Sequence, residues 1–154
     1  MLLFVSNVIA QNNAWSKTTV KEEISGISLK NLDPDNSEIL QLDIQNFKQQ
    51  LIGAPLRGAS NGKSNVIVNF PSVDGKIQQY RIVETQIFSS NDNQAQHPGI
   101  KTYLGSRTDG SGTRVRFSVT PLGLKAMISE PDKETVYIQP VTKVSNGQYI
   151  VYNR

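Results

Sequence analysis

The chain contains no cysteine and only one histidine, His97, among its 154 residues. The absence of cysteine excludes disulfide bonds, thiolate metal ligands and cysteine nucleophiles. A catalytic zinc site needs about three protein ligands, usually including two or three histidines, so a single histidine argues against such a site. Secretion is still compatible with the sequence, because a domain of this length can bury a core without disulfide bonds.

The sequence also lacks charged runs and long apolar segments. The 16 Lys and Arg residues and 13 Asp and Glu residues give a net charge of +3, and the basic residues are scattered along the chain. A nucleic-acid surface would require clustered Lys and Arg with interleaved aromatic residues. No segment approaches the length of a membrane-spanning helix. We therefore expect neither a nucleic-acid partner nor a membrane span.

The stretch "HPGIKTYLGS" (97–106) combines residue types that can carry catalysis, but it lacks a catalytic framework. A serine hydrolase would use His97 as its base, and no G-x-S-x-G motif presents a serine nucleophile. Pro98 disfavours a helical conformation for His97 and places it in an extended segment. The "GSGT" sequence (110–113) has the glycines of a turn between two strands. We interpret 97–99 as a loop that leads into a strand.

Two further motifs fail on spacing. "GASNGKS" (58–64) is one residue short of a phosphate-binding P-loop and precedes a strand. Asp33, Asp35 and Glu38 lack the central glycine and the terminal glutamate of a calcium-binding EF-hand loop. We therefore assign no catalytic, cofactor-binding or metal-binding residues, and we expect no cofactor in this chain.

One short helix is predicted over residues 43–53. Asp43 is a favourable N-cap residue, and Gly53 followed by Pro55 ends the helix. The predicted apolar stripe recurs at spacings of three and four residues and consists of Leu40, Ile44, Phe47, Leu51 and Ile52. We interpret it as a core-facing stripe, since a short helix depends on tertiary packing.

The rest of the chain has the alternation of β-strands. Asp74-Gly75 favours a tight hairpin turn, and Val115, Phe117 and Val119 alternate with polar residues. Turn signals recur about every eight to twelve residues, which is typical of antiparallel β domains. We predict a mainly β fold, α+β at most: an antiparallel sheet or sandwich-like domain of about six to eight strands with one short helix.

The expected organisation has three parts. Residues 1–10 form a signal-peptide remnant, because the apolar run stops at Gln11 after a small-residue pattern; a buried N-terminal strand is the alternative. Residues 11–42 form an extended, polar and loosely packed lead-in. Residues 43–154 form the β-rich domain. The expected location is secreted, either extracellular or periplasmic.

Three segments in order carry a resemblance to a known family: "VNFPSVDGKIQQYRIVETQIF" (68–88), "HPGIKTYLGSRTDGSGTRVRFSVTPLGLKAMI" (97–128) and "VYIQPV" (136–141). This pattern resembles the N-terminal region of secreted reprolysin-like zinc metallopeptidases (metzincins) of Bacteroidetes-type bacteria. It covers roughly Trp15 to Arg154. Leu124 stands where phenylalanine is commoner in the family, and Thr85 where serine is frequent.

The resemblance implies a β-rich prodomain that precedes a catalytic domain. The chain would then be non-catalytic and would inhibit the catalytic domain of its own parent, a zinc-dependent metalloendopeptidase, or assist its folding. Zinc belongs to that catalytic domain, and no zinc ligands carry over to positions in this chain. Inhibition through a cysteine thiolate is impossible because the chain has no cysteine. We therefore favour steric cover of the active-site cleft over binding of the zinc by an occasional ligand such as a carboxylate or His97.

Two alternatives are kept. One is a free-standing secreted β-rich module that binds protein or glycan through exposed aromatic residues. Its candidate residues are Trp15, Tyr80, Tyr103, Tyr137, Tyr149 and Tyr152. Such residues also serve in cores and in strand pairing. The other alternative is an enzyme whose site is not recognisable from sequence.

Overall fold

The structure is a computed structural model that describes residues 13–18, 36–59, 63–86, 96–142 and 147–154. It is mainly β, as predicted, with one α-helix among the described residues. The elements are β1 (Trp15–Lys17), β2 (Ser37–Leu42), α1 (Ile44–Gln50), β3 (Ile67–Pro71), β4 (Ile77–Thr85), β5 (Lys101–Arg107), β6 (Arg114–Thr120), β7 (Gly123–Ser129), β8 (Val136–Pro140) and β9 (Gln148–Asn153).

All nine strands belong to one antiparallel sheet in the order β1-β2-β9-β8-β7-β6-β5-β4-β3. From β3 to β9 each strand pairs with the next along the chain, which is a simple meander. β2 pairs with β9, the last strand, and β1 adds outside β2. The predicted number of strands, about six to eight, is therefore too low, because β1 and β2 were not predicted as strands.

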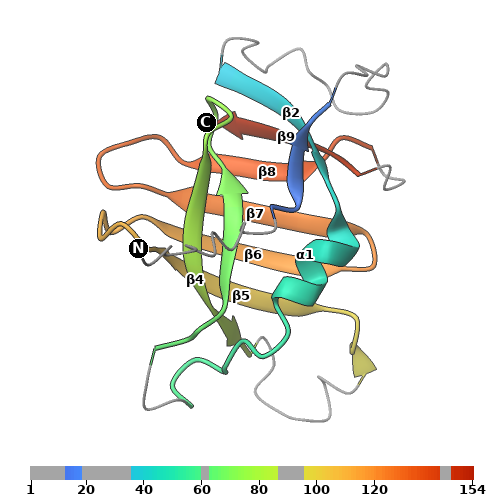
Figure 1. The fold of residues 1–154 in the computed structure, drawn as a ribbon. Coiled ribbons are helices and arrows are strands. Elements are labelled where there is room, and N and C mark those ends of the chain that lie inside the picture. The colour runs from blue at the N-terminus through green and yellow to red at the C-terminus, as the bar shows by residue number, and fades with distance from the viewer. Residues whose placement is uncertain (1–12, 19–35, 60–62, 87–95, 143–146) are drawn as a thin grey trace, which may run out of the picture.

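The sheet curls until its two edges approach each other. Trp15 on edge strand β1 donates a hydrogen bond from Nε1 to the backbone oxygen of Asn69 on edge strand β3, with a length of 2.8 Å. A Cβ built on Gly75, in the β3–β4 turn, would lie 3.8 Å from Cδ of Glu38 on β2. Figure 1 shows β3 and β4 crossing in front of the strands that follow them. The result is one nearly closed sheet instead of two packed sheets.

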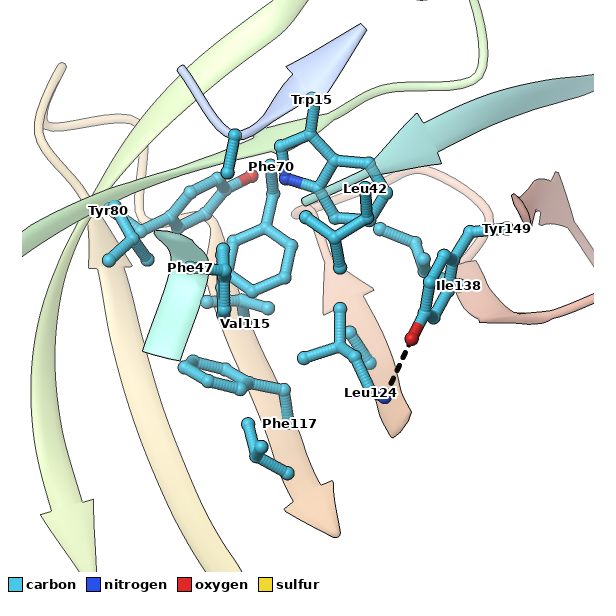
Figure 2. Packing of buried hydrophobic residues seen from close by; sticks show 14 of the residues in the cluster. Trp15, Leu42, Phe47, Phe70, Tyr80, Val115, Phe117, Leu124, Ile138 and Tyr149 are labelled. Carbon is cyan, nitrogen blue, oxygen red and sulfur yellow. Dashed lines mark hydrogen bonds between the residues drawn. The ribbon is translucent and has the colours of Figure 1, made fainter. Parts of the chain in front are cut away.

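Aromatic side chains fill the enclosed core (Figure 2). Phe117 lies among several of them: its ring centroid is 5.0 Å from that of Phe70, 5.9 Å from that of Phe47 and 4.9 Å from that of Tyr103, which stacks on it. Trp15 contacts Phe70 and Tyr149 from the edge strand. Because edge-to-face and offset pairs add to the burial of apolar area, this cluster holds the curled sheet together.

Helix α1 lies across the sheet beside the β3–β4 hairpin (Figure 1). Asp43 caps it as predicted, since its side chain accepts a hydrogen bond of 3.0 Å from the backbone N–H of Asn46. Phe47 and Leu51 are buried. In the described parts of the chain, no helix is long and apolar enough to cross a membrane.

The predicted apolar stripe is wrong at both ends. Leu40 belongs to β2 and not to the helix. The helix ends at Gln50, short of the predicted Gly53, and Ile52 is 77% exposed. Leu51 is the C-cap, and the N–H groups of Leu51 and Ile52 bond to carbonyls three residues back, at Lys48 and Gln49, instead of four. Ile52 therefore no longer follows the helical repeat that the sequence spacing assumed.

Residues 11–42 were expected to be loosely packed, and their described parts are not. β1 and β2 are strands of the sheet, and Trp15, Leu40 and Leu42 are each at most 3% exposed. The packing of β2 depends on β9, which lies about a hundred residues further along the chain. The local composition of residues 11–42 does not show that such a partner strand exists. The predicted signal-peptide remnant, residues 1–10, lies outside the described residues.

Candidate functional site

The residues of the "HPGIKTYLGS" stretch are not assembled into a catalytic group. His97 is exposed in the segment before β5, where its backbone oxygen accepts a hydrogen bond of 3.1 Å from Ile100. Ser106 lies near the other end of β5, on the opposite side of the sheet from buried Tyr103 and Gly105. The glycines of the "GSGT" sequence (110–113) form the β5–β6 turn, with φ of +76° and +80°. The predicted loop and turn are both present.

The other two motifs are likewise structural where they are described. Ser64, the last residue of "GASNGKS", is buried, and its Oγ accepts a hydrogen bond of 3.1 Å from the Val66 backbone. Glu38 belongs to β2, whereas Asp33 and Asp35 fall outside the described residues. Within the described ranges, no group of three or more His, Cys, Asp or Glu residues could hold a metal ion.

The aromatic candidates divide between the core and the opposite face of the sheet. Trp15, Tyr80, Tyr103 and Tyr149 are buried in the core. Tyr137 on β8 and Tyr152 on β9 are partly exposed, and their rings stack with centroids 5.6 Å apart at 26°. Both point away from the core, since their strand neighbours Ile138 and Val151 are buried and side chains alternate along a strand.

The strand register organises this outer face into rows. One row runs Val83, Leu104, Arg116, Met127, Tyr137, Tyr152 across β4 to β9. The next row runs Thr85, Thr102, Ser118, Lys125. A third runs Arg81, Ser106, Arg114, Ser129 on the other side of the first. Residues in a row are direct cross-strand neighbours, so residues far apart in sequence form one surface.

A groove follows the first two rows, and we call it the outer groove. Its cavity volume is about 530 Å³. The outward side chains that line it are Arg57, Thr85, Thr102, Leu104, Arg116, Ser118, Lys125, Met127, Tyr137 and Gln139. The hydroxyls of Thr85 and Thr102 lie 2.8 Å apart, which fixes the β4–β5 end of the groove. Arg116 and Lys125 are exposed, whereas Leu104 and Met127, on either side of Arg116, are partly buried.

Acidic side chains lie away from this face. Within the nine strands the only carboxylates belong to Glu38 and Glu84, which alternate with the outward positions and therefore share the core-facing side. Glu84 forms an ion pair of 3.3 Å with Lys101. Other described ion pairs lie in the turns, where Asp109 is 2.8 Å from Arg107 and Glu130 is 2.9 Å from Lys133. The outer groove is consequently lined by positive charge alone among the described residues.

Sequence reasoning missed the outer groove, although part of its signal was visible. The alternation in "TRVRFSVT" (113–120) placed Arg114, Arg116 and Ser118 on the solvent side of a half-buried strand. The basic residues looked scattered because the groove collects Arg57, Arg116 and Lys125 from distant segments. Only the register of the neighbouring strands brings them together.

Comparisons with protein-family models, curated proteins and solved structures gave no significant match to this chain.

Proposed function

We propose that this chain is the non-catalytic prodomain of a secreted zinc metallopeptidase, which inhibits its catalytic domain or assists its folding. The supporting observation is where the resemblance motifs lie. They occupy the consecutive strands β3 to β8, and several of their glycines stand at positions where the fold requires glycine. A pattern made of such residues is what a shared fold would preserve.

Three glycines illustrate this point. Gly75 has φ of +78° in the β3–β4 turn, a conformation that favours glycine. Gly105 lies opposite Val115, and a Cβ there would come within 2.6 Å of side-chain atoms of Ile82 and Val115. Gly123 has φ of +112° and its Cβ would lie 2.6 Å from the Tyr149 hydroxyl oxygen.

The mode of action that fits this chain is steric cover. The chain has no cysteine that could bind the zinc of a catalytic domain as a thiolate. A nearly closed sheet with a densely packed aromatic core offers a rigid surface, and rigid surfaces lose little conformational entropy on association. The catalytic domain of the parent metallopeptidase is the proposed partner.

The coding DNA beyond Arg154 tests the proposal directly. An in-frame H-E-x-x-H-x-x-G-x-x-H motif within the following two hundred codons or so, the expected result, would provide the missing zinc ligands. The purified chain should then reduce the activity of the mature protease or raise the yield of its refolding. An immediate stop codon, with an intact mass that corresponds to the chain alone, would contradict the prodomain assignment.

A free-standing binding module for protein or glycan is the second candidate. The outer groove and the stacked pair of Tyr137 and Tyr152 favour it, because a partly exposed aromatic pair beside a groove suits ligand contact. The same DNA sequence separates the two candidates. A stop codon favours the free-standing module, and a zincin motif in frame favours the prodomain.

A further inference from the structure

The outer groove has a charge pattern that selects for an anionic ligand. Arg57, Arg116 and Lys125 line it, and Arg81 and Arg114 stand in the adjacent row. Among the described residues, neither Arg116 nor Lys125 has a carboxylate within ion-pair distance. Like charges on one face repel each other, so an anion would gain from contact with several of them at once.

Apolar side chains lie beside the cations within the groove. Leu104 and Met127 flank Arg116 in the same cross-strand row, and the ring of Tyr137 follows them. A ligand that lies across this row meets apolar side chains on both sides of Arg116, and Lys125 lies in the adjacent row. An extended peptide with acidic residues among apolar ones complements that order. A sulfated polysaccharide would satisfy the cations, but it has no apolar side chains for Leu104 and Met127.

The dimensions also suit a short peptide. The groove crosses the strands from β4 to β8, and neighbouring strands lie about 4.8 Å apart, so its length is about 19 Å. An extended chain advances about 3.3 Å for each residue, and about six residues would fill the groove. Arginine can receive a carboxylate through two parallel hydrogen bonds, which gives Arg116 a specific role at the centre of the row.

We propose that the outer groove binds an extended, acidic peptide segment of a partner protein. Carboxylates of the segment contact Arg116 and Lys125, and its apolar side chains cover Leu104 and Met127. This binding site goes beyond the prodomain assignment and does not depend on it, because it follows from the side chains of the groove.

The test uses the full chain and a fluorescently labelled peptide of about eight residues in which Glu and Val alternate. Fluorescence anisotropy measures its affinity at low ionic strength. We expect binding that weakens as salt is added, because exposed charges are screened within about 10 Å at 0.1 M salt. Two comparison peptides separate the contributions. Replacing Glu by Gln should abolish binding, and replacing Val by Ser should weaken it.

Matched variants locate the site. The double substitution R116Q/K125Q should weaken binding about tenfold, which equals about 1.4 kcal/mol. K17Q/K133Q removes the same net charge at exposed positions on β1 and in the β7–β8 turn, outside the groove, and should leave the affinity within about twofold. If R116Q/K125Q does not fold by circular dichroism, M127E provides the second variant, since a carboxylate in the groove should also abolish binding.

Three results would overturn the proposal. The first is no change in anisotropy up to about 1 mM chain, which corresponds to less than about 4 kcal/mol of binding free energy. The second is equal weakening by both double variants, which would show that diffuse charge and not the groove attracts the peptide. The third is tight binding of a heparin fragment that depends on Arg116 and Lys125 while the Glu–Val peptide fails to compete, which would make the ligand a glycan.

Discussion

Gly105 occupies a place in β5 where two neighbouring strands leave no room for a side chain. A Cβ at this position would lie 2.6 Å from Ile82 Cδ1 and 2.6 Å from Val115 Cγ1, both in the packed core. Gly105→Ala should lower the free energy of unfolding by about 3 kcal/mol, because overpacking forces core side chains and backbone to shift. Urea denaturation measures the loss. The neighbouring change Ser106→Ala, on the exposed face, should stay within about 0.5 kcal/mol.

The Tyr149 hydroxyl completes the hydrogen bonding of β7 at the point where the β7–β8 ladder stops. Toward Leu124, that ladder ends at the pair of Ala126 with Ile138, so no residue of β8 pairs with Leu124. The backbone N–H of Leu124 donates a hydrogen bond of 3.1 Å to Tyr149 Oη (Figure 2).

Tyr149→Phe should therefore cost about 2 kcal/mol of stability, since it leaves a buried N–H without an acceptor. Thermal or urea unfolding gives the value. Tyr152→Phe is the matched control on the same strand, at a partly exposed position, and should change stability by less than about 0.5 kcal/mol. Equal losses in the two variants would show that the Leu124 hydrogen bond contributes nothing.

The raised pKa values of two core tyrosines, Tyr80 and Tyr103, lead us to expect that the free energy of unfolding falls at alkaline pH. Burial raises the pKa of Tyr80 to about 12 and that of Tyr103 to about 12, where the nearby Glu84 adds to the effect. A raised folded-state pKa means that the stabilisation is complete below the ordinary value near 10. It is lost as the pH rises through the folded-state pKa of about 12.

Unfolding free energy measured from neutral pH upward should thus be affected by these groups only above about pH 10. Tyr103→Phe should reduce the alkaline decline relative to the parent chain. Tyr137→Phe, on the outer face, is the control and should leave the decline unchanged. An identical alkaline profile for the parent chain and the Tyr103 variant would contradict the assignment.

Helix α1 depends on its cap because it has only seven residues, too few for a stable isolated helix. Asp43→Ala removes the acceptor for the Asn46 N–H and should lower the stability by about 1 kcal/mol. Asp43→Asn retains an acceptor and should lose less. Gln45→Ala, at an exposed helix position, should have no destabilising effect. Urea unfolding of the three variants checks the order.

Elements with a clear two-residue period were predictable, and elements defined by distant partners were not. The alternation of Val115, Phe117 and Val119 predicted the buried side of β6 correctly, and the strand carries those three residues at 0%, 4% and 6% exposure. β1 has three residues and β2 is partly polar, so β1 depends on its pairing with β2, and β2 on its pairing with β9. The outer groove was missed for the same reason, because it exists only once the register is fixed.

At the scale of the whole molecule, the curl of the sheet separates two environments. The inner side holds the aromatic core, and the strand carboxylates Glu38 and Glu84 share its side at strand ends. The outer face of the strands carries Arg81, Arg114, Arg116 and Lys125. Closure of the sheet therefore encloses the aromatic core on one side and leaves these cations on the other.

Trp15 reports on this closure, because it is the single tryptophan of the chain and lies on edge strand β1. It is 3% exposed, and its Nε1 bonds to Asn69 on the opposite edge. If closure belongs to one cooperative unit, urea unfolding followed by tryptophan fluorescence and by far-UV circular dichroism should give the same midpoint.

Trp15→Phe should lower that midpoint in circular dichroism, since it removes the hydrogen bond to Asn69 and part of a ring packed against Phe47 and Phe70. We expect a loss of about 2 kcal/mol, with the steepness of the transition unchanged. A fluorescence change at clearly lower urea than the circular dichroism change would mean that β1 detaches before the rest of the sheet. In that case the molecule would be a stable open meander with a separable edge, and the hydrogen bond of Trp15 would not contribute to global stability.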